Sequence, residues 1–423
     1  MQNAFKPVTL ADALTAVRFL RANAPLKAIR GDHKRRDYRE RLVLLAQLFE
    51  EAKAEQQPGP TLAESVTLCG LSRSFDTFAQ DCCRQFLATA EWEVARKSET
   101  GRTRRVSPSD LQRHISLSHT ELGRLQRGFL RYVTLQSLIH PLITGVNESL
   151  SSQDIATLFT NFTPWEIEEI ACVHQYTVDW LRKILDDVED DFVESVTTKE
   201  GPLRWRFLPN GENKRASLSS LEVEGPFISN SEDELGPDGV SWQESDDVRG
   251  SSTIMFLKSE KNMMPKLIEH LATLPFKCFR TLVGSNNPQR RSIINRNYHW
   301  KWESLEKAMC CGISPEPRYL FFQAEHQGRQ RSQKLEFEGD DLHKRNLAWL
   351  WAHQMMPYPG YYDRCDMDLR AWGYVFWDKD RLERMRLLEE TRPSRYPLSR
   401  PPYYPEPVSR PSAQERLRSL GFA

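Results

Sequence analysis

The residues whose types and spacing most directly suggest chemistry lie near the C-terminus, where Pro401-Pro402-Tyr403-Tyr404 matches the PPxY pattern. Seven prolines stand within 393–411. Because proline fixes φ and lacks a backbone N–H, this tail is expected to be extended as polyproline II. Such a segment loses little entropy on binding, so the pattern predicts that Pro401, Pro402 and Tyr404 bind a WW-domain partner, for example a HECT-type ubiquitin ligase. The alternative is a proline-rich tail that packs on its own protein or binds nothing.

Three serines are candidates for phosphorylation. Ser107 and Ser217 each have basic residues two and three positions before them, as substrates of basophilic kinases do. Ser231 precedes an acidic run of the kind that acidophilic kinases recognise. A phosphate adds close to two negative charges, so modification at any of these serines would change the local electrostatics. Short patterns of this kind also arise by chance, and that alternative stays open.

Two groups of side chains could form a buried base or a cation site within one expected helix. His174 lies on the apolar face of that helix, but a core histidine is the favoured reading because no ligand shares its face. Asp187, Asp190, Asp191 and Glu194 share a face and could hold a divalent cation, although a solvated acidic face is favoured. No P-loop, GxGxxG, GxSxG, HExxH or EF-hand pattern is present. We therefore predict no catalytic, cofactor-binding or metal residue, and whether the chain is an enzyme stays open.

The composition excludes several classes of protein. The chain has 423 residues, 58 basic and 58 acidic side chains and 39% hydrophobic residues, which is typical of a globular protein of two or three domains. No run approaches the ~18–20 apolar residues that a membrane span requires, and the N-terminus lacks an apolar signal segment. The eight cysteines include no CxxC pair, so they are expected to be structural thiols. We expect a protein of the cytoplasm or the nucleus without a membrane partner or a cofactor.

The zero net charge conceals an uneven distribution. Seventeen acidic and five basic side chains lie between Asp186 and Asp247, so the remainder of the chain is mildly basic. No basic groove interleaved with aromatic residues accompanies that excess, and nucleic acid is therefore not favoured as a partner.

Helical signals dominate the order of elements along the chain. Apolar residues recur at helical spacing after Thr9 and again across 42–52. Ser118-His119-Thr120-Glu121 is a capping box, and Thr163-Pro164-Trp165-Glu166 combines an N-cap threonine, an N1 proline and an N3 glutamate. The apolar face behind the second signal predicts a long central helix that extends to Val188. The fold class is therefore mainly α.

Composition divides the chain into four parts. A helical domain is predicted over 1–205 and an acidic, Ser/Gly-rich disordered linker over 206–252. A second, mainly helical domain is predicted over 253–392, with Asp378 as the N-cap of its last helix, and a proline-rich tail over 393–423. Whether the two ordered parts share one core stays open.

Three stretches carry a family resemblance. The segments 122–132 (LGRLQRGFLRY), 162–174 (FTPWEIEEIACVH) and 370–378 (RAWGYVFWD) together resemble a group of uncharacterised filamentous-fungal proteins, some of them labelled F-box-like. The resemblance covers roughly 110–200 and 340–392. The group brings no established activity, so it implies no catalytic residue.

The leading hypothesis is a non-enzymatic interaction or adaptor protein whose tail is a WW-domain ligand. A second hypothesis, which follows from the fungal resemblance, is an enzyme or accessory factor of secondary metabolism encoded in a biosynthetic gene cluster. A third is a nuclear nucleic-acid-binding protein. The oligomeric state stays open.

Overall fold

The computed structural model describes residues 7–22, 33–53, 59–98, 117–144, 159, 162–198, 263–296, 337–353, 367–385, 388, 416 and 419. Among these residues every regular element is an α-helix or a short 3-10 helix, and no strand occurs. The predicted mainly α fold is therefore confirmed. No described helix is both long and apolar enough to cross a membrane.

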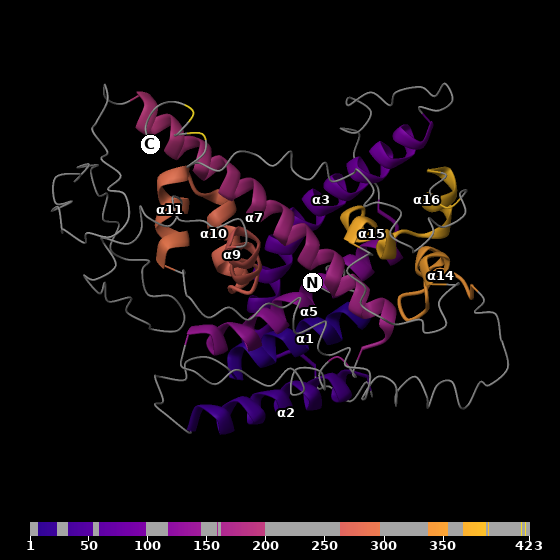
Figure 1. Ribbon diagram of the computed structural model, residues 1–423. Coiled ribbons are helices and arrows are strands. Elements are labelled where there is room, and N and C mark those ends of the chain that lie inside the picture. Colours follow the sequence, from indigo (N-terminus) through magenta and orange to yellow (C-terminus); the bar gives the residue numbers. More distant parts are fainter. Residues whose placement is uncertain are drawn as a thin grey trace.

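Five helices of the N-terminal half form the larger part of the body. They are α1 (Pro7–Ala22), α2 (His33–Lys53), α3 (Leu62–Ser98), α5 (His119–Thr144) and α7 (Pro164–Thr198). Helix α5 packs on both α1 and α7, while α1 also contacts α2 and α3. In Figure 1, α7 runs across the molecule as its longest visible diagonal, with α5 and α1 below it.

The remaining elements complete the described part of the body. They are α9 (Met263–Ala272), α10 (Phe276–Gly284), α11 (Asn287–Arg296), α14 (Leu347–His353), α15 (Met367–Ala371), the 3-10 helix η3 (Tyr374–Phe376) and α16 (Lys379–Arg384). Figure 1 shows two groups: α9, α10 and α11 lie toward the C-terminal end of α7, whereas α14, α15 and α16 lie toward its N-terminal end. Elements from both halves of the sequence thus use α7 as a common support.

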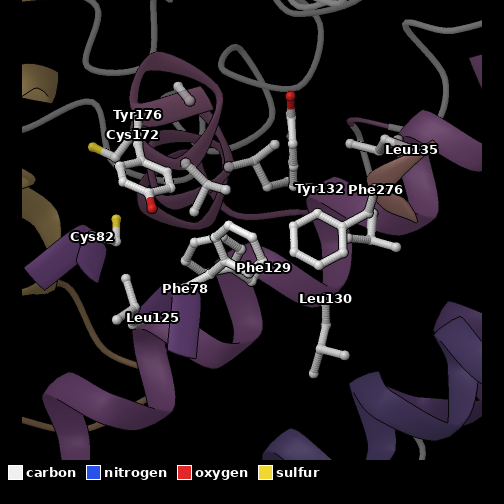
Figure 2. Packing of buried hydrophobic residues seen from close by; sticks show 14 of the residues in the cluster. Phe78, Cys82, Leu125, Phe129, Leu130, Tyr132, Leu135, Cys172, Tyr176 and Phe276 are labelled. Atoms are coloured by element: carbon white, nitrogen blue, oxygen red, sulfur yellow. The ribbon is translucent and has the colours of Figure 1, made fainter. Parts of the chain in front are cut away.

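A single hydrophobic core joins the two halves. It contains buried residues from α1 through to Leu382 of α16. At its centre the ring of Phe86 stacks on Phe376 with centroids 5.8 Å apart, and Tyr176 packs edge-on against both Phe86 and Phe129. Figure 2 shows this region with Phe129 and Tyr176 between α5 and α7. The predicted boundaries at 205, 253 and 392 fall outside the described residues, so that division stays a prediction.

Two glycines permit close contacts that the core needs. Gly373 has φ +63°, and a Cβ there would lie 2.3 Å from the ring of Phe86. Gly128 on α5 lets the backbone of α7 approach, since a Cβ there would lie 3.1 Å from the carbonyl oxygen of Glu169. Gly128 lies in 122–132 and Gly373 in 370–378, two of the stretches on which the predicted resemblance rests.

The predicted helix starts are confirmed with two refinements. Ser118 and Glu121 exchange the reciprocal bonds of a capping box at 2.9 and 3.1 Å. At the start of α7 the Thr163 N–H donates to Glu166 at 2.9 Å, but the Thr163 hydroxyl has no hydrogen-bond partner among the described residues. Asp378 is the N-cap residue of α16, yet its carboxylate does not bond to that helix. The reason is that other partners hold this carboxylate.

Candidate functional site: a buried arginine cluster

Helix α5 places three arginines inside the protein. Arg124, Arg127 and Arg131 recur at spacings of three and four, so they share one face of the helix, and all three are buried. Burying a guanidinium is costly unless it is paired and hydrogen-bonded. The cluster therefore depends on carboxylates that other elements supply. With Arg370, Arg381 and their acidic partners, these residues form what we call the arginine cluster.

The pair formed by Arg127 and Glu169 is the most deeply buried. Both side chains are 0% exposed. The guanidinium donates two parallel bonds, from Nε at 2.8 Å and from Nη2 at 2.6 Å, which is the bidentate geometry that suits a carboxylate. One turn away, Arg131 pairs with Asp12 of α1 at 2.9 Å and with Glu166 at 3.0 Å. Two carboxylates of α7 and one of α1 are thus fixed to α5.

Arg124 connects α5 to the C-terminal elements. Its Nη1 donates to the Asp378 carboxylate at 2.8 Å and to the carbonyl oxygen of Phe376 at 3.2 Å, while Nη2 donates to the carbonyl oxygen of Asp341 at 3.2 Å. The hydroxyls of Ser118 and Thr120 also donate to Asp378. These bonds explain why Asp378 does not cap α16.

Two further bidentate ion pairs also join C-terminal elements to the N-terminal helices. Arg370 of α15 donates to Glu168 of α7 at 2.9 and 2.8 Å. Arg381 of α16 donates to Glu121 of α5 at 2.6 and 2.7 Å. Glu121 therefore both caps its own helix and holds the last described helix of the body. Each contact joins residues more than 200 positions apart in the sequence.

The pKa values of Glu166 and Glu169 shift in opposite directions. Burial raises the pKa of Glu166, but the Arg131 and Arg127 guanidiniums and the Thr163 N–H outweigh that effect and lower the pKa to about 2. The acidic partners also raise the pKa of Arg127 despite its burial. Burial raises the pKa of Glu169, although the Arg127 guanidinium opposes that shift. The mutual pairing of these groups is suited to holding elements together.

The arginine cluster joins three stretches of the sequence, 122–132, 162–174 and 370–378. The first stretch supplies three arginines, Arg124, Arg127 and Arg131. The second supplies three glutamate partners, Glu166, Glu168 and Glu169. The third begins with Arg370 and ends with Asp378. Two features of the sequence indicate buried charge: three arginines stand within the apolar helix 119–144, and three glutamates stand in the first two turns of the next long helix. The sequence does not predict which arginine pairs with which carboxylate, because the partners are far apart in the chain.

His174 lies between α7 and α9. It is 3% exposed, and its Nε2 lies 3.2 Å from a carboxylate oxygen of Glu269. Its Nδ1 is buried without a hydrogen-bond partner among the described residues. The ring of Tyr132 packs 6.0 Å away, and its hydroxyl donates to the carbonyl oxygen of Ala272. His174 is thus buried, as predicted, but within the described residues its hydrogen bonds are not fully satisfied, whereas the prediction was of a satisfied core histidine.

The acidic end of α7 meets arginines. Asp187 pairs with Arg290 at 3.3 Å and Asp191 pairs with Arg291 at 2.6 Å, both on α11. Asp190 pairs with Arg416 at 2.8 Å. Within the described residues no group of three or more potential metal ligands occurs.

The described cysteines are free thiols, and burial raises the pKa of Cys83 to about 12 and that of Cys278 to about 11. Thiols with such values are protonated and unreactive at neutral pH.

The residues predicted to bind a partner or to accept phosphate lie outside the described part of the chain. These residues are Pro401, Pro402, Tyr404, Ser107, Ser217 and Ser231. They stay predictions from the sequence.

No protein-family model, no curated protein and no solved structure matches this chain. The resemblance to the fungal group stays a prediction.

Proposed function

We propose that the protein is a non-enzymatic helical scaffold of the adaptor type, which offers its C-terminal proline-rich segment to a WW-domain partner. One observation carries the geometric side of the proposal: α16, the last described helix before the tail, is fixed to the body. Arg381 of α16 forms a bidentate ion pair with Glu121 of α5. Asp378, the N-cap residue of α16, accepts a hydrogen bond from Arg124. The PPxY motif begins at Pro401, 17 positions after Arg384, the last residue of α16.

The pairing of the buried arginines with carboxylates supports the same proposal. The arginines of the cluster are bound by carboxylates of the protein itself, with bidentate geometry at Arg127, Arg370 and Arg381. These pairs join different helices to one another, which favours a supporting body. An adaptor needs such a body, because a bound partner is positioned only if the segment that binds it starts from a fixed point.

The test compares two neighbouring tyrosines. Tyr404 occupies the final position of the PPxY pattern, whereas Tyr403 occupies its variable position. We expect Tyr404→Ala to weaken binding of the full chain to a WW domain of a HECT-type ligase by about tenfold or more, as loss of an anchoring tyrosine does. Tyr403→Ala is the matched control and is expected to change affinity by less than about threefold.

Titration calorimetry measures these affinities. Affinity purification of the wild type and of both variants from cells, followed by mass spectrometry, identifies the partner. Equal loss of binding in both variants, or no WW-domain binding by the wild type, would contradict the proposal.

A further inference from the structure

A short segment without regular structure contacts the N-terminal turns of both α5 and α16. It comprises residues 338–346, and we call it the strap. The side chain of Leu342 in the strap lies against Gly123 of α5, where an added Cβ would be 2.6 Å from it. At the end of the strap, Asn346 donates a hydrogen bond to the carbonyl oxygen of Val375 at 2.6 Å. Contacts along its length therefore hold the strap on the body.

Asp340 of the strap binds the first turn of α16. Its Oδ2 accepts a hydrogen bond from the backbone N–H of Lys379 at 3.0 Å, which satisfies one of the N–H groups that a helix start leaves without an intrahelical partner. Asp378 stands at the N-cap position, but its carboxylate binds Arg124 and does not bond to α16. The capping bond thus comes from a residue 39 positions earlier in the chain.

Asp340 and Asp378 share one guanidinium. Nη1 of Arg124 lies 2.8 Å from Oδ1 of Asp378, whereas its Nη2 lies 3.6 Å from Oδ1 of Asp340, which is too long for a hydrogen bond. This Oδ1 of Asp340 is buried and has no hydrogen-bond partner among the described residues. One buried positive charge is therefore divided between two carboxylates, and the charge of Asp340 is the less well compensated of the two.

Several charged or titratable groups lie on the elements that contact Asp340. They are Glu121 and Arg124 of α5, Asp378 before α16, Lys379 and Arg381 of α16, and Glu338, Asp341, His343 and Lys344 of the strap. Glu121 is paired with Arg381 in the arginine cluster. Of these groups, Arg124 lies within ion-pair distance of Asp340.

We propose that the strap is a pH-sensitive contact, which binds α5 and α16 more tightly when Asp340 takes up a proton. A proton from solvent binds to Oδ1 of Asp340, and no other covalent bond changes. The neutral carboxyl group still accepts the Lys379 N–H through its carbonyl oxygen. Its repulsion with the carboxylate of Asp378 is removed, and Arg124 then serves one negative charge in place of two. This inference does not depend on whether the tail binds a WW domain.

The direction of the effect follows from burial and charge. Burial raises the pKa of Asp340 above its ordinary value of 3.8, and the charge of Asp378 adds to the rise. The Lys379 N–H and Arg124 oppose the rise without cancelling it. A group whose pKa is higher in the folded state takes up its proton on folding. Its contribution to stability is therefore complete below 3.8 and is lost as the pH rises through the raised pKa.

The test measures hydrogen exchange of the full chain between about pH 4.5 and 7.5, the range above the ordinary pKa of an aspartate. Peptides covering 337–353 are read by mass spectrometry, and each rate is divided by the intrinsic exchange rate at that pH. Asparagine resembles the protonated carboxyl group in shape and charge. We expect Asp340→Asn to exchange more slowly than the wild type at the neutral end, by up to about tenfold. The two proteins should converge at the acidic end.

Asp341→Asn is the matched control. Asp341 accepts the backbone N–H of His343 at 3.0 Å, which lowers the pKa of this carboxyl group, so it stays ionised throughout the range. This variant should keep the pH dependence of the wild type. Asp340→Ala loses the capping bond and should exchange faster than the wild type at every pH.

Three results would overturn the proposal. The first is a ratio of wild-type to Asp340→Asn exchange rates that is the same at both ends of the pH range. The second is faster exchange of Asp340→Asn than of the wild type at the neutral end, because the charge itself would then hold the strap. The third is loss of the wild-type pH dependence in Asp341→Asn, because the effect would then not belong to Asp340.

Discussion

At the scale of single residues, the fold depends on charges that cannot reach water. Arg127 and Glu169 are wholly buried against each other. If one partner is removed, the other remains as an uncompensated charge in a region of low dielectric constant. The ion pair as a whole contributes less to the free energy of unfolding than the removal of one partner costs. The arginine cluster therefore specifies which helices meet more than it adds to total stability.

This reasoning gives a prediction for Arg127. Arg127→Met is expected to lower the free energy of unfolding by about 3–5 kcal/mol because Glu169 is left unpaired, whereas adding Glu169→Leu should restore most of that loss. The surface pair of Lys344 and Glu338, 3.9 Å apart and exposed on both sides, provides the control. Lys344→Ala should cost less than about 1 kcal/mol. Urea unfolding followed by circular dichroism measures all four proteins, and a double variant no more stable than Arg127→Met would refute the account.

At the scale of elements, local sequence patterns predict where helices begin better than they predict which helices contact one another. The capping boxes at Ser118 and Thr163 mark the starts of α5 and α7, because a cap is formed by residues only three positions apart. The same signal at Thr61 and Glu64 begins the 37-residue helix α3, which was not predicted although its box is formed in the same way. Asp378 shows what a local pattern does not predict. It stands at the N-cap position as predicted, but its carboxylate binds Arg124.

A prediction at this scale concerns the turn between α15 and η3. Gly373→Ala is expected to destabilise the protein by about 2–4 kcal/mol, because Ala is strained at φ +63° and its Cβ would clash with Phe86. Gly339 is the matched control: its φ is +106°, but a Cβ there would meet nothing within 4 Å. Gly339→Ala should therefore cost only backbone strain, about 1–3 kcal/mol for a residue in a sparsely populated region. Thermal unfolding compares the two variants, and equal losses of stability would show that the contact with Phe86 is unimportant.

At the scale of the whole molecule, segments on both sides of 199–262 belong to one core. Phe86 of α3 stacks on Phe376, and Arg370 of α15 is held by Glu168 of α7. The sequence predicted two mainly helical regions, since each has its own apolar periodicity. It could not show that they share one interior, because the contacts that join them span more than 200 residues and leave no periodic pattern.

The most direct test of this shared interior is hydrogen exchange of the full chain in increasing denaturant, resolved into peptides from α5 (His119–Thr144) and from the described part of 337–385. If the arginine cluster and the common core join these segments into one cooperative unit, their most protected amides open with the same free energy and the same dependence on denaturant. In Arg370→Met both segments should then be destabilised together. Opening of 337–385 at lower denaturant, while α5 stays protected, would contradict the account.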